Sequence, residues 1–313
     1  MNLLQTISEI PICFGGAAIS GEGGGYGFGE ISDTSANALL MQAFDLGITI
    51  FDTAPIYGFG LSEKRLGMAF RRKREKVFII SKSGVTWHNN RRVNMTNDPV
   101  TTIKMLEQSL RDLQSDYIDL YMIHWPDNKI DIRRPMEALA SAKSQGKIKH
   151  LGLCNTNLVD LDLAAQIDSI EVVQSEFNLF HRQSEDFLNY LSSHHIAFMS
   201  WGTFDKGIIS GTVTNDRTYD RSDARGWAPW WDKKANRKKI ATIEKIATLL
   251  NAHGHTLLEL ACGYNLTHPP LTHLLCGMRT PWQLNETIRA VKNPPPRSLI
   301  AQAKSIIDQA MAE

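Results

Sequence analysis

Four side chains that can do proton chemistry stand close to the ends of apolar runs in the first half of the chain. Asp52, Lys82 and His124 each close such a run, and Tyr57 follows Asp52 by five positions. Short apolar runs bounded by polar residues are typical of buried strands. The sequence therefore predicts polar groups at the points where three successive strands leave the core.

These residue types fit the transfer of a proton to or from an oxygen. A free tyrosine has a pKa of about 10 and is a poor acid near neutrality unless a cation stabilises its phenolate. Lys82 can supply that charge, and Asp52 can keep the lysine protonated in a closed pocket. His124 can relay a proton or orient a substrate oxygen. The set favours carbonyl reduction over chemistry that needs a nucleophile with an adjacent base.

Each of the four residues has an ordinary structural interpretation when it is taken singly. An Asp or Lys at a strand end often forms a loop salt bridge, and a lone His is more often a hydrogen-bonded core residue than a catalyst. Their joint occurrence at successive strand ends argues against that interpretation for all four.

Strands and helices alternate along the chain. Eight strands are predicted, at residues 10–14, 48–52, 77–82, 117–124, 148–153, 170–174, 196–201 and 272–276. Helices are predicted between and after them, at 35–46, 62–70, 99–113, 133–145, 158–166, 185–193, 239–266 in two pieces, and 281–291. Eight strand–helix units favour one (β/α)8 TIM barrel domain over residues 1–313, and an open doubly wound sheet is the alternative.

The glycine cluster at residues 21–29 does not fit a dinucleotide fingerprint. That fingerprint needs Gly-x-Gly-x-x-Gly between a strand and a helix, with an acidic residue about 20 positions later. The cluster lacks this spacing, and we interpret it as a flexible first loop. A barrel places its active site on the loops after the strands, where the four polar residues already lie.

Composition excludes several classes of partner. The formal charge of +1 gives no bulk field for nucleic acid or an anionic membrane. Four dispersed cysteines and the lack of a long apolar run favour a cytoplasmic protein with free thiols. The pairs His194-His195 and His253-x-His255 lack further ligands at helical spacing, so we expect no metal site.

The chain resembles the aldo-keto reductases over nearly its whole length. The matching motifs are Asp52-Thr53-Ala54 with Tyr57-Gly58, Gly60-x-Ser62-Glu63 with Leu66-Gly67, Lys82, Leu120-Tyr121-x-x-His124-Trp125-Pro126-Asp127, Gly146-Lys147-Ile148 with Gly152, Asn155, Gln174 with Asn178, Gly207, and Gly277-x-Arg279 with Gln283 and Glu286. The resemblance implies a (β/α)8 barrel that binds a nicotinamide cofactor across its mouth. It implies that Tyr57 is the general acid, that Lys82 lowers its pKa, that Asp52 holds Lys82, and that His124 orients the carbonyl.

The resemblance also implies a set of cofactor contacts. Asn155 and Gln174 match positions that hold the nicotinamide carboxamide, Cys154 stands where the family usually has Ser, and Trp201 stands where an aromatic ring, commonly Tyr, stacks on the nicotinamide. Gly207, Gly277, Gln283 and Glu286 are assigned to the same cofactor site. Arg279 matches the residue that usually meets the 2′-phosphate of NADPH, so NADPH is expected and NADH is possible.

The loops around the mouth are rich in aromatic residues. Trp87 and Trp125 follow Lys82 and His124 and are expected to line the substrate pocket. Segment 203–238, with three tryptophans at 227–231, is expected to form a lid or an oligomer contact. These walls suit a small carbonyl compound or a sugar-like alcohol or lactol alike.

The sequence leaves two other function classes open. A barrel subunit that binds nicotinamide and regulates a partner with slow redox chemistry can retain the same four residues. A barrel enzyme of another chemistry, such as a lyase or isomerase, is the third class. The direction of the reaction and the oligomeric state are not encoded in the residue spacing.

Overall fold

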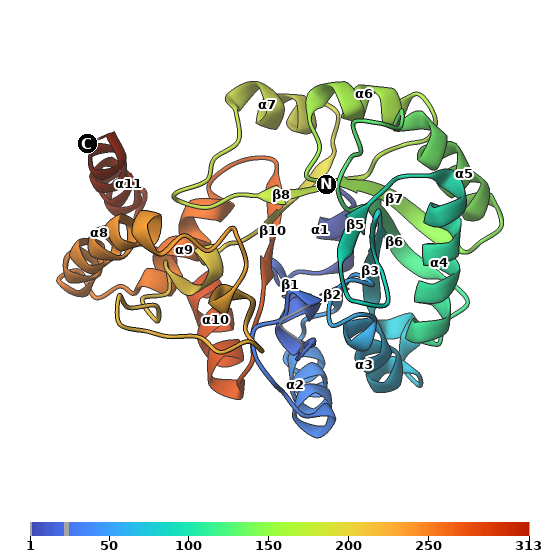
Figure 1. Ribbon diagram of the computed structural model, residues 1–313. Helices are drawn as coiled ribbons and strands as arrows, with labels where there is room; N and C mark the ends of the chain where they lie inside the picture. Colours follow the sequence, from blue (N-terminus) through green and yellow to red (C-terminus); the bar gives the residue numbers. More distant parts are fainter. Residues whose placement is uncertain (1, 22–24, 313) are drawn as a thin grey trace.

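A closed barrel of parallel strands forms the centre of the molecule. The computed structural model describes residues 2–21 and 25–312. Within these residues, eight strands close in the order β1-β10-β9-β8-β7-β6-β3-β2, and Figure 1 shows helices around this central sheet. The strands are β1 (Ile12–Gly15), β2 (Ile50–Asp52), β3 (Phe78–Ser83), β6 (Ile118–Ile123), β7 (Ile148–Cys154), β8 (Val172–Glu176), β9 (Ala197–Trp201) and β10 (Leu271–Cys276). The predicted (β/α)8 fold is confirmed.

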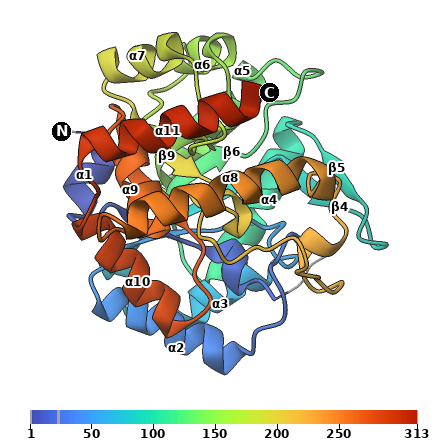
Figure 2. The same ribbon diagram turned by 90° about the vertical axis from the view of Figure 1, so that its left-hand side faces the viewer.

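Helices surround the barrel. They are α1 (Leu3–Ile7), α2 (Asp33–Asp45), α3 (Leu61–Phe70), α4 (Pro99–Leu113), α5 (Arg133–Ser144), α6 (Leu158–Ala165), α7 (Glu185–Ser193), α8 (Lys233–Asn251), α9 (Leu257–Leu266), α10 (Pro281–Lys292) and α11 (Arg297–Ala312). Short 3₁₀ turns lie at Gly16–Ile19 (η1), Arg74–Lys76 (η3), Asp205–Gly207 (η4) and Ala224–Gly226 (η5). Figure 2 shows α11 running along the outside of α8 and α9.

Two hydrophobic layers stabilise the fold. The larger one fills the space between the strands and the surrounding helices. The smaller one fills the barrel interior, with Leu4, Cys13, Ile50, Phe78, Ile80, Leu120, Met122, Cys154, Val172, Ala197 and Met199. Leu4 belongs to α1, so this short helix closes the end of the barrel at which the strands begin.

A polar layer lies above the apolar interior, at the carboxyl ends of the barrel strands. Side chains two residues apart on a strand share a face. On β3 the interior residues Phe78 and Ile80 are followed by Lys82, and on β8 the interior residue Val172 is followed by Gln174. Polar side chains therefore lie at the carboxyl-end mouth directly above the apolar interior.

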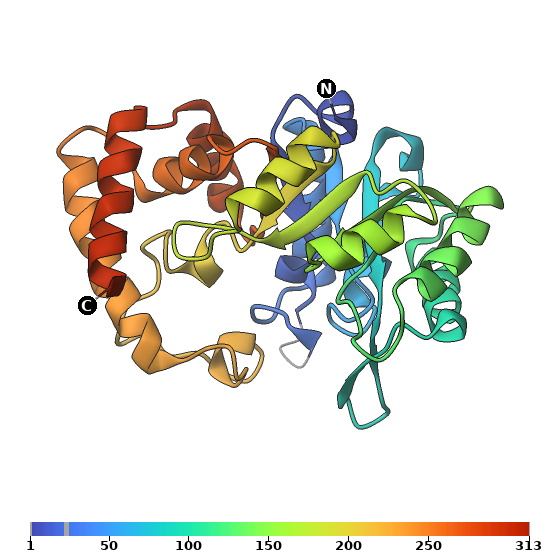
Figure 3. The same ribbon diagram turned by 90° about the horizontal axis from the view of Figure 1, so that it is seen from above.

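Several segments extend from this mouth. Figure 3 shows the first loop, the segment between β9 and α8, and the antiparallel hairpin β4 (Val85–Trp87) with β5 (Val93–Met95) on the same side of the barrel. Residues 25–29 of the predicted flexible first loop are described, whereas residues 22–24 lie outside the described part.

Some elements differ from the sequence prediction. The hairpin and α1 were not predicted, and α8 begins at Lys233 rather than at residue 239. The Asp232 side chain accepts hydrogen bonds from the backbone of Lys234 and Ala235 and so caps the helix. No helix in residues 2–21 and 25–312 combines the length and the apolar character needed to cross a membrane.

Candidate active site

A buried ion pair lies at the centre of the mouth. Lys82 Nζ is 2.6 Å from Asp52 Oδ2, and it also donates to the carbonyl oxygen of Thr53 at 2.9 Å. Both charged side chains are essentially inaccessible to solvent. Burial acts to lower the pKa of Lys82, but the charge of Asp52 and its hydrogen bond, together with the neighbouring Tyr57 and Cys154, raise that pKa above its usual value. The lysine is therefore a fixed cation within the barrel.

Tyr57 lies against this cation. The Lys82 ammonium is 5.3 Å from the centroid of the phenol ring. Burial raises the pKa of Tyr57 above its usual value, and the positive charge of Lys82 opposes that rise. Tyr57 comes from the turn that follows β2, so the strand that carries Asp52 also delivers the phenol.

His124 stands beside Tyr57. The two ring centroids are 5.8 Å apart with an interplanar angle of 88°, an edge-to-face contact. The backbone of His124, one residue beyond β6, is held by a 2.9 Å hydrogen bond to the carbonyl oxygen of Ser83. Burial and the nearby Lys82 charge hold the pKa of His124 well below its usual value. The imidazole is thus neutral at pH 7, and it can orient an oxygen without carrying charge.

Asn155 and Trp201 form a second hydrogen-bonded group next to His124. The indole Nε1 of Trp201 donates to Asn155 Oδ1 at 2.9 Å, and Asn155 Nδ2 donates to the His124 carbonyl oxygen at 3.0 Å. Lys206 Nζ lies 5.8 Å from the Trp201 ring centroid. The structure therefore brings these two predicted cofactor residues to the catalytic group and fixes the plane of the indole.

Cys154 and Gln174 complete the polar layer. The Cys154 thiol donates to Gln174 Oε1 at 3.4 Å, and Gln174 Nε2 donates to Asp52 Oδ2 at 2.9 Å. Burial raises the pKa of Cys154 to about 12, so the sulfur is a thiol at neutral pH. Both residues lie within reach of the catalytic pair, as the sequence predicts for cofactor residues.

The residues expected at the adenine end lie on the loop after β10 and on α10. Arg279 Nη1 donates to the carbonyl oxygens of Phe28 and Gly29, the latter at 2.8 Å, and Nη2 donates to that of Glu30 at 2.8 Å. Gln283 Oε1 accepts from the Arg279 backbone at 2.7 Å. Arg279 therefore fastens the first loop to the start of α10.

The remaining predicted cofactor residues are Glu286 on α10, Gly277 after β10 and Gly207 at the end of η4. Glu286 pairs with Arg289 at 2.7 Å on α10. Gly277 is exposed directly after β10, and a Cβ there would lie 3.3 Å from that of Ala18. Gly207 ends η4 with φ of +102°, a conformation that favours glycine. Glu286 thus has a partner within its own helix.

Trp87 and Trp125 reach the mouth from neighbouring loops. Trp125 stacks beside His124 with ring centroids 6.5 Å apart. Trp87 lies in a cluster of partly buried side chains that includes Tyr57, and its ring is 5.4 Å from that of Phe59. Both tryptophans are therefore placed to contact a substrate that meets Tyr57 and His124.

The long segment after β9 lies against the first loop. Phe28 forms an isolated antiparallel bridge with Asp223, and the rings of Tyr26 and Trp227 are 6.0 Å apart. Lys206 Nζ, which lies near Trp201, is also 5.8 Å from the ring centroid of Trp230. The loops that follow β1 and β9, two strands on either side of β10, are thus joined near the mouth.

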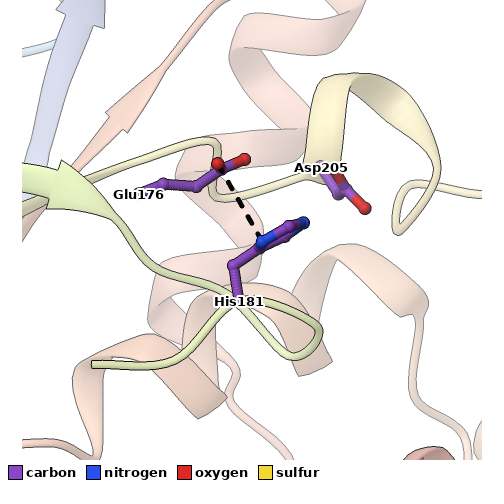
Figure 4. A group of neighbouring side chains, drawn as sticks. All are labelled: Glu176, His181 and Asp205. Carbon is purple, nitrogen blue, oxygen red and sulfur yellow. Dashed lines mark ion pairs between the residues drawn. The ribbon is translucent and has the colours of Figure 1, made fainter. Parts of the chain in front are cut away.

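A cluster of ligand-type side chains, which the sequence analysis missed, lies at the base of this segment. Figure 4 shows Glu176, His181 and Asp205 pointing toward one another. Lys206 binds Glu176 at 2.6 Å, and Lys239 binds Asp205 at 2.7 Å. Because two ammonium groups already neutralise the two carboxylates, we interpret the cluster as an ion-pair network that ties the segment to α8. The five residues come from three separate stretches of the sequence, and no spacing pattern typical of a ligand set joins them.

Comparisons with known proteins agree with this geometry. A profile described as the aldo/keto reductase family matches residues 11–308. The aldo-keto reductase YhdN of Bacillus subtilis is 31% identical over 265 residues, which cover 83% of this chain and 80% of the relative. The NADH-specific methylglyoxal reductase of Escherichia coli is 27% identical over 266 residues, which cover 80% and 81% of the two chains.

A solved structure supports the same assignment. The glycerol dehydrogenase of Gluconobacter oxydans superposes with a TM-score of 0.84 at 28% identity, covering 97% of this chain and 93% of that one. The family match spans nearly the whole barrel. The chain therefore belongs to the aldo/keto reductase family and is an NAD(P)-dependent oxidoreductase of carbonyl and alcohol groups.

Proposed function

We propose that the chain is an NADPH-dependent reductase of aldehydes or ketones, or a dehydrogenase of sugar-like alcohols or lactols in the reverse direction, with Tyr57 as general acid and base. The observation that carries the proposal is the buried Lys82–Asp52 pair, 2.6 Å across, in contact with Tyr57 and next to a neutral His124. A fixed cation beside a phenol is the arrangement that lets the phenol give and recover a proton.

Each residue has a distinct role in the proposed reaction. Tyr57 donates its phenolic proton to the carbonyl oxygen during reduction, and Lys82 stabilises the resulting phenolate. Asp52 keeps Lys82 protonated in a site where burial alone would discharge it. His124, which is neutral, donates a hydrogen bond to the substrate oxygen and fixes its position.

The mouth fits a nicotinamide nucleotide, which when bound supplies the hydride. The half-exposed ring of Trp201 offers a face for stacking, and Gly277 leaves the backbone after β10 open to a ligand. Arg279 donates three hydrogen bonds to the first loop. Its side chain has five N–H groups, so two remain to bind a phosphate. These remaining donors favour NADPH, whereas the NADH specificity named for the Escherichia coli relative makes NADH the alternative.

The proposed substrate class rests on the aromatic side chains at the mouth and on the substrates named for two relatives. Trp87 and Trp125 offer flat apolar faces that suit either a small carbonyl compound or the C–H face of a polyol. Two relatives are named for methylglyoxal and glycerol. We therefore propose short oxygenated substrates with adjacent carbonyl or hydroxyl groups.

The decisive experiment replaces the phenol. Tyr57→Phe is expected to lower kcat by about 10²–10⁴-fold, the usual contribution of a general acid, while nucleotide binding measured by tryptophan fluorescence is retained. Tyr190→Phe is the control, since Tyr190 bonds Asp162 on the outer helices, away from the mouth. Unchanged turnover in Tyr57→Phe would remove the proposed role of this residue.

A further inference from the structure

The side-chain amide of Gln174 is bonded to the catalytic ion pair. Gln174 is almost wholly buried on β8, and its Nε2 donates to Asp52 Oδ2 at 2.9 Å. The same oxygen accepts from Lys82 Nζ at 2.6 Å. The other carboxylate oxygen, Asp52 Oδ1, has no hydrogen-bond partner among the described residues. Gln174 therefore supplies one of the few donors that stabilise this buried carboxylate.

The orientation of the amide follows from its two neighbours. A carboxylate only accepts hydrogen bonds, so the NH₂ group of Gln174 must face Asp52. The carbonyl oxygen Oε1 then faces Cys154, whose thiol donates to it at 3.4 Å. Because Cys154 stays a thiol at neutral pH, the donor remains present. A hydrogen-bonded chain thus runs from Cys154 through Gln174 to Asp52 and Lys82.

We propose that Gln174 is a positioning residue that acts through Asp52 on the proton held between Lys82 and Tyr57. This inference rests on the proposed function, and it adds a role that contact with a nicotinamide carboxamide alone does not give.

The negative charge of Asp52 is shared between two donors, Lys82 and Gln174. The Gln174 donor draws part of the Asp52 charge away from Lys82, so the ammonium acts more strongly on Tyr57. Loss of this donor leaves the carboxylate to neutralise Lys82 more fully, and the pKa of Tyr57 then rises. Oxidation requires the phenolate and slows at any pH below that pKa, whereas reduction uses the phenol, which is already protonated at pH 7.

The test compares pH profiles of three proteins. Gln174→Met keeps the volume and removes the donor, and Met199→Leu is the matched control because Met199 Sδ contacts Gln174 Nε2 at 3.3 Å without touching Asp52. In Gln174→Met the acidic limb of kcat/KM for alcohol oxidation is expected to move up by about one pH unit, a tenfold loss at fixed pH. The Met199→Leu profile is expected to match the wild type. Gln174→Leu serves as the donor-free variant where Gln174→Met does not fold.

Two results would overturn the inference. A donor-free variant that binds nucleotide more weakly but keeps the wild-type pH profile would make Gln174 a cofactor ligand alone. A loss of activity with an unmoved limb would indicate a general packing defect.

A cofactor-free measurement separates this inference from the proposed function. The Gln174 side-chain amide signal in ¹H–¹⁵N NMR spectra of the unliganded protein is identified by its loss in Gln174→Met. It is expected to shift in Asp52→Asn, because the acceptor is then no longer a carboxylate. An unshifted signal overturns the inference. Absence of turnover by the wild type on every carbonyl and alcohol tested overturns the proposed function, and the NMR result then decides the contact independently.

Discussion

The two ends of the proposed nucleotide site are built from different materials. At the catalytic end, Lys82, Asp52 and Gln174 lie on strands, are buried, and bond one another through side chains. At the far end, Arg279 bonds the backbone of the first loop, and Phe28 pairs with Asp223 of the long segment. In the proposed site, the register of the barrel strands therefore sets the positions of the reacting side chains. The backbone conformation of the loops sets the contacts with the rest of the nucleotide.

The largest effect should come from breaking the strand-borne ion pair. Lys82→Met leaves Asp52 buried without its cation, so we expect unfolding to become easier by about 3–5 kcal/mol and turnover to fall by about 10³-fold or more. Chemical denaturation and steady-state kinetics measure both quantities. Lys149→Met is the control, since Lys149 is half-exposed and its partner Asp119 keeps a second cation in Arg74. Comparable losses in both variants would show that the mouth pair is an ordinary structural bridge.

The next effect concerns the far end of the site. Arg279→Ala is expected to weaken NADPH binding by about tenfold to a hundredfold, the range for a hydrogen bond to a charged group, and to leave NADH binding nearly unchanged. Fluorescence titration with each nucleotide measures this, and Arg111→Ala is the control, because Arg111 is exposed on α4 and bonds only Gln108 among the side chains described there. Equal weakening of both nucleotides would mean that Arg279 acts by holding the first loop and not by recognising a phosphate.

A smaller effect is expected from the long segment. Lys206 lies 5.8 Å from the ring centroids of both Trp230 and Trp201, so we expect Trp230→Ala to loosen the segment without altering Tyr57. We expect nucleotide release in stopped-flow measurements to accelerate by about threefold to tenfold, with little change in the association rate. Release at the wild-type rate would show that this segment does not cover the nucleotide.

The smallest expected effect is the absence of a pH inflection. Because the pKa of His124 is held well below its usual value, kcat/KM for reduction should stay level as pH falls through about 6.5, where a free imidazole protonates. The unfolded chain takes up that proton first, so this histidine makes the free energy of unfolding fall as pH drops below about 6.5. A rate that halves near pH 6.5 and is level in His124→Gln would assign the inflection to this ring and contradict a neutral role.

The same division explains what the sequence predicts. Strand ends are readable because apolar runs stop at Asp52, Lys82 and His124, and parallel strands bring their carboxyl ends together. The strand positions, the barrel and the meeting of these residues follow from that pattern. The bond between Gln174 and Asp52 does not, because it joins β8 to β2 across the barrel and depends on register and side-chain angles.

Loops carry less readable information. Arg279 contacts carbonyl groups, which every residue has, so no residue type in the first loop signals the contact. The start of α8 was missed because charged residues hide the apolar period in its first turns, although Asp232 is a recognisable cap. The helix α1 was not predicted because it is only five residues long, too short to show an apolar period, and it packs into the barrel interior through Leu4.

The stacked interior of the barrel has a consequence for how this protein can change over evolutionary time. The polar layer lies directly above the apolar layer, and both are positioned by the strands. Trp87 and Trp125 instead belong to the hairpin and to a loop outside the barrel sheet. We therefore expect substitutions of these two tryptophans to change the preferred substrate while the proposed proton-transfer residues stay the same.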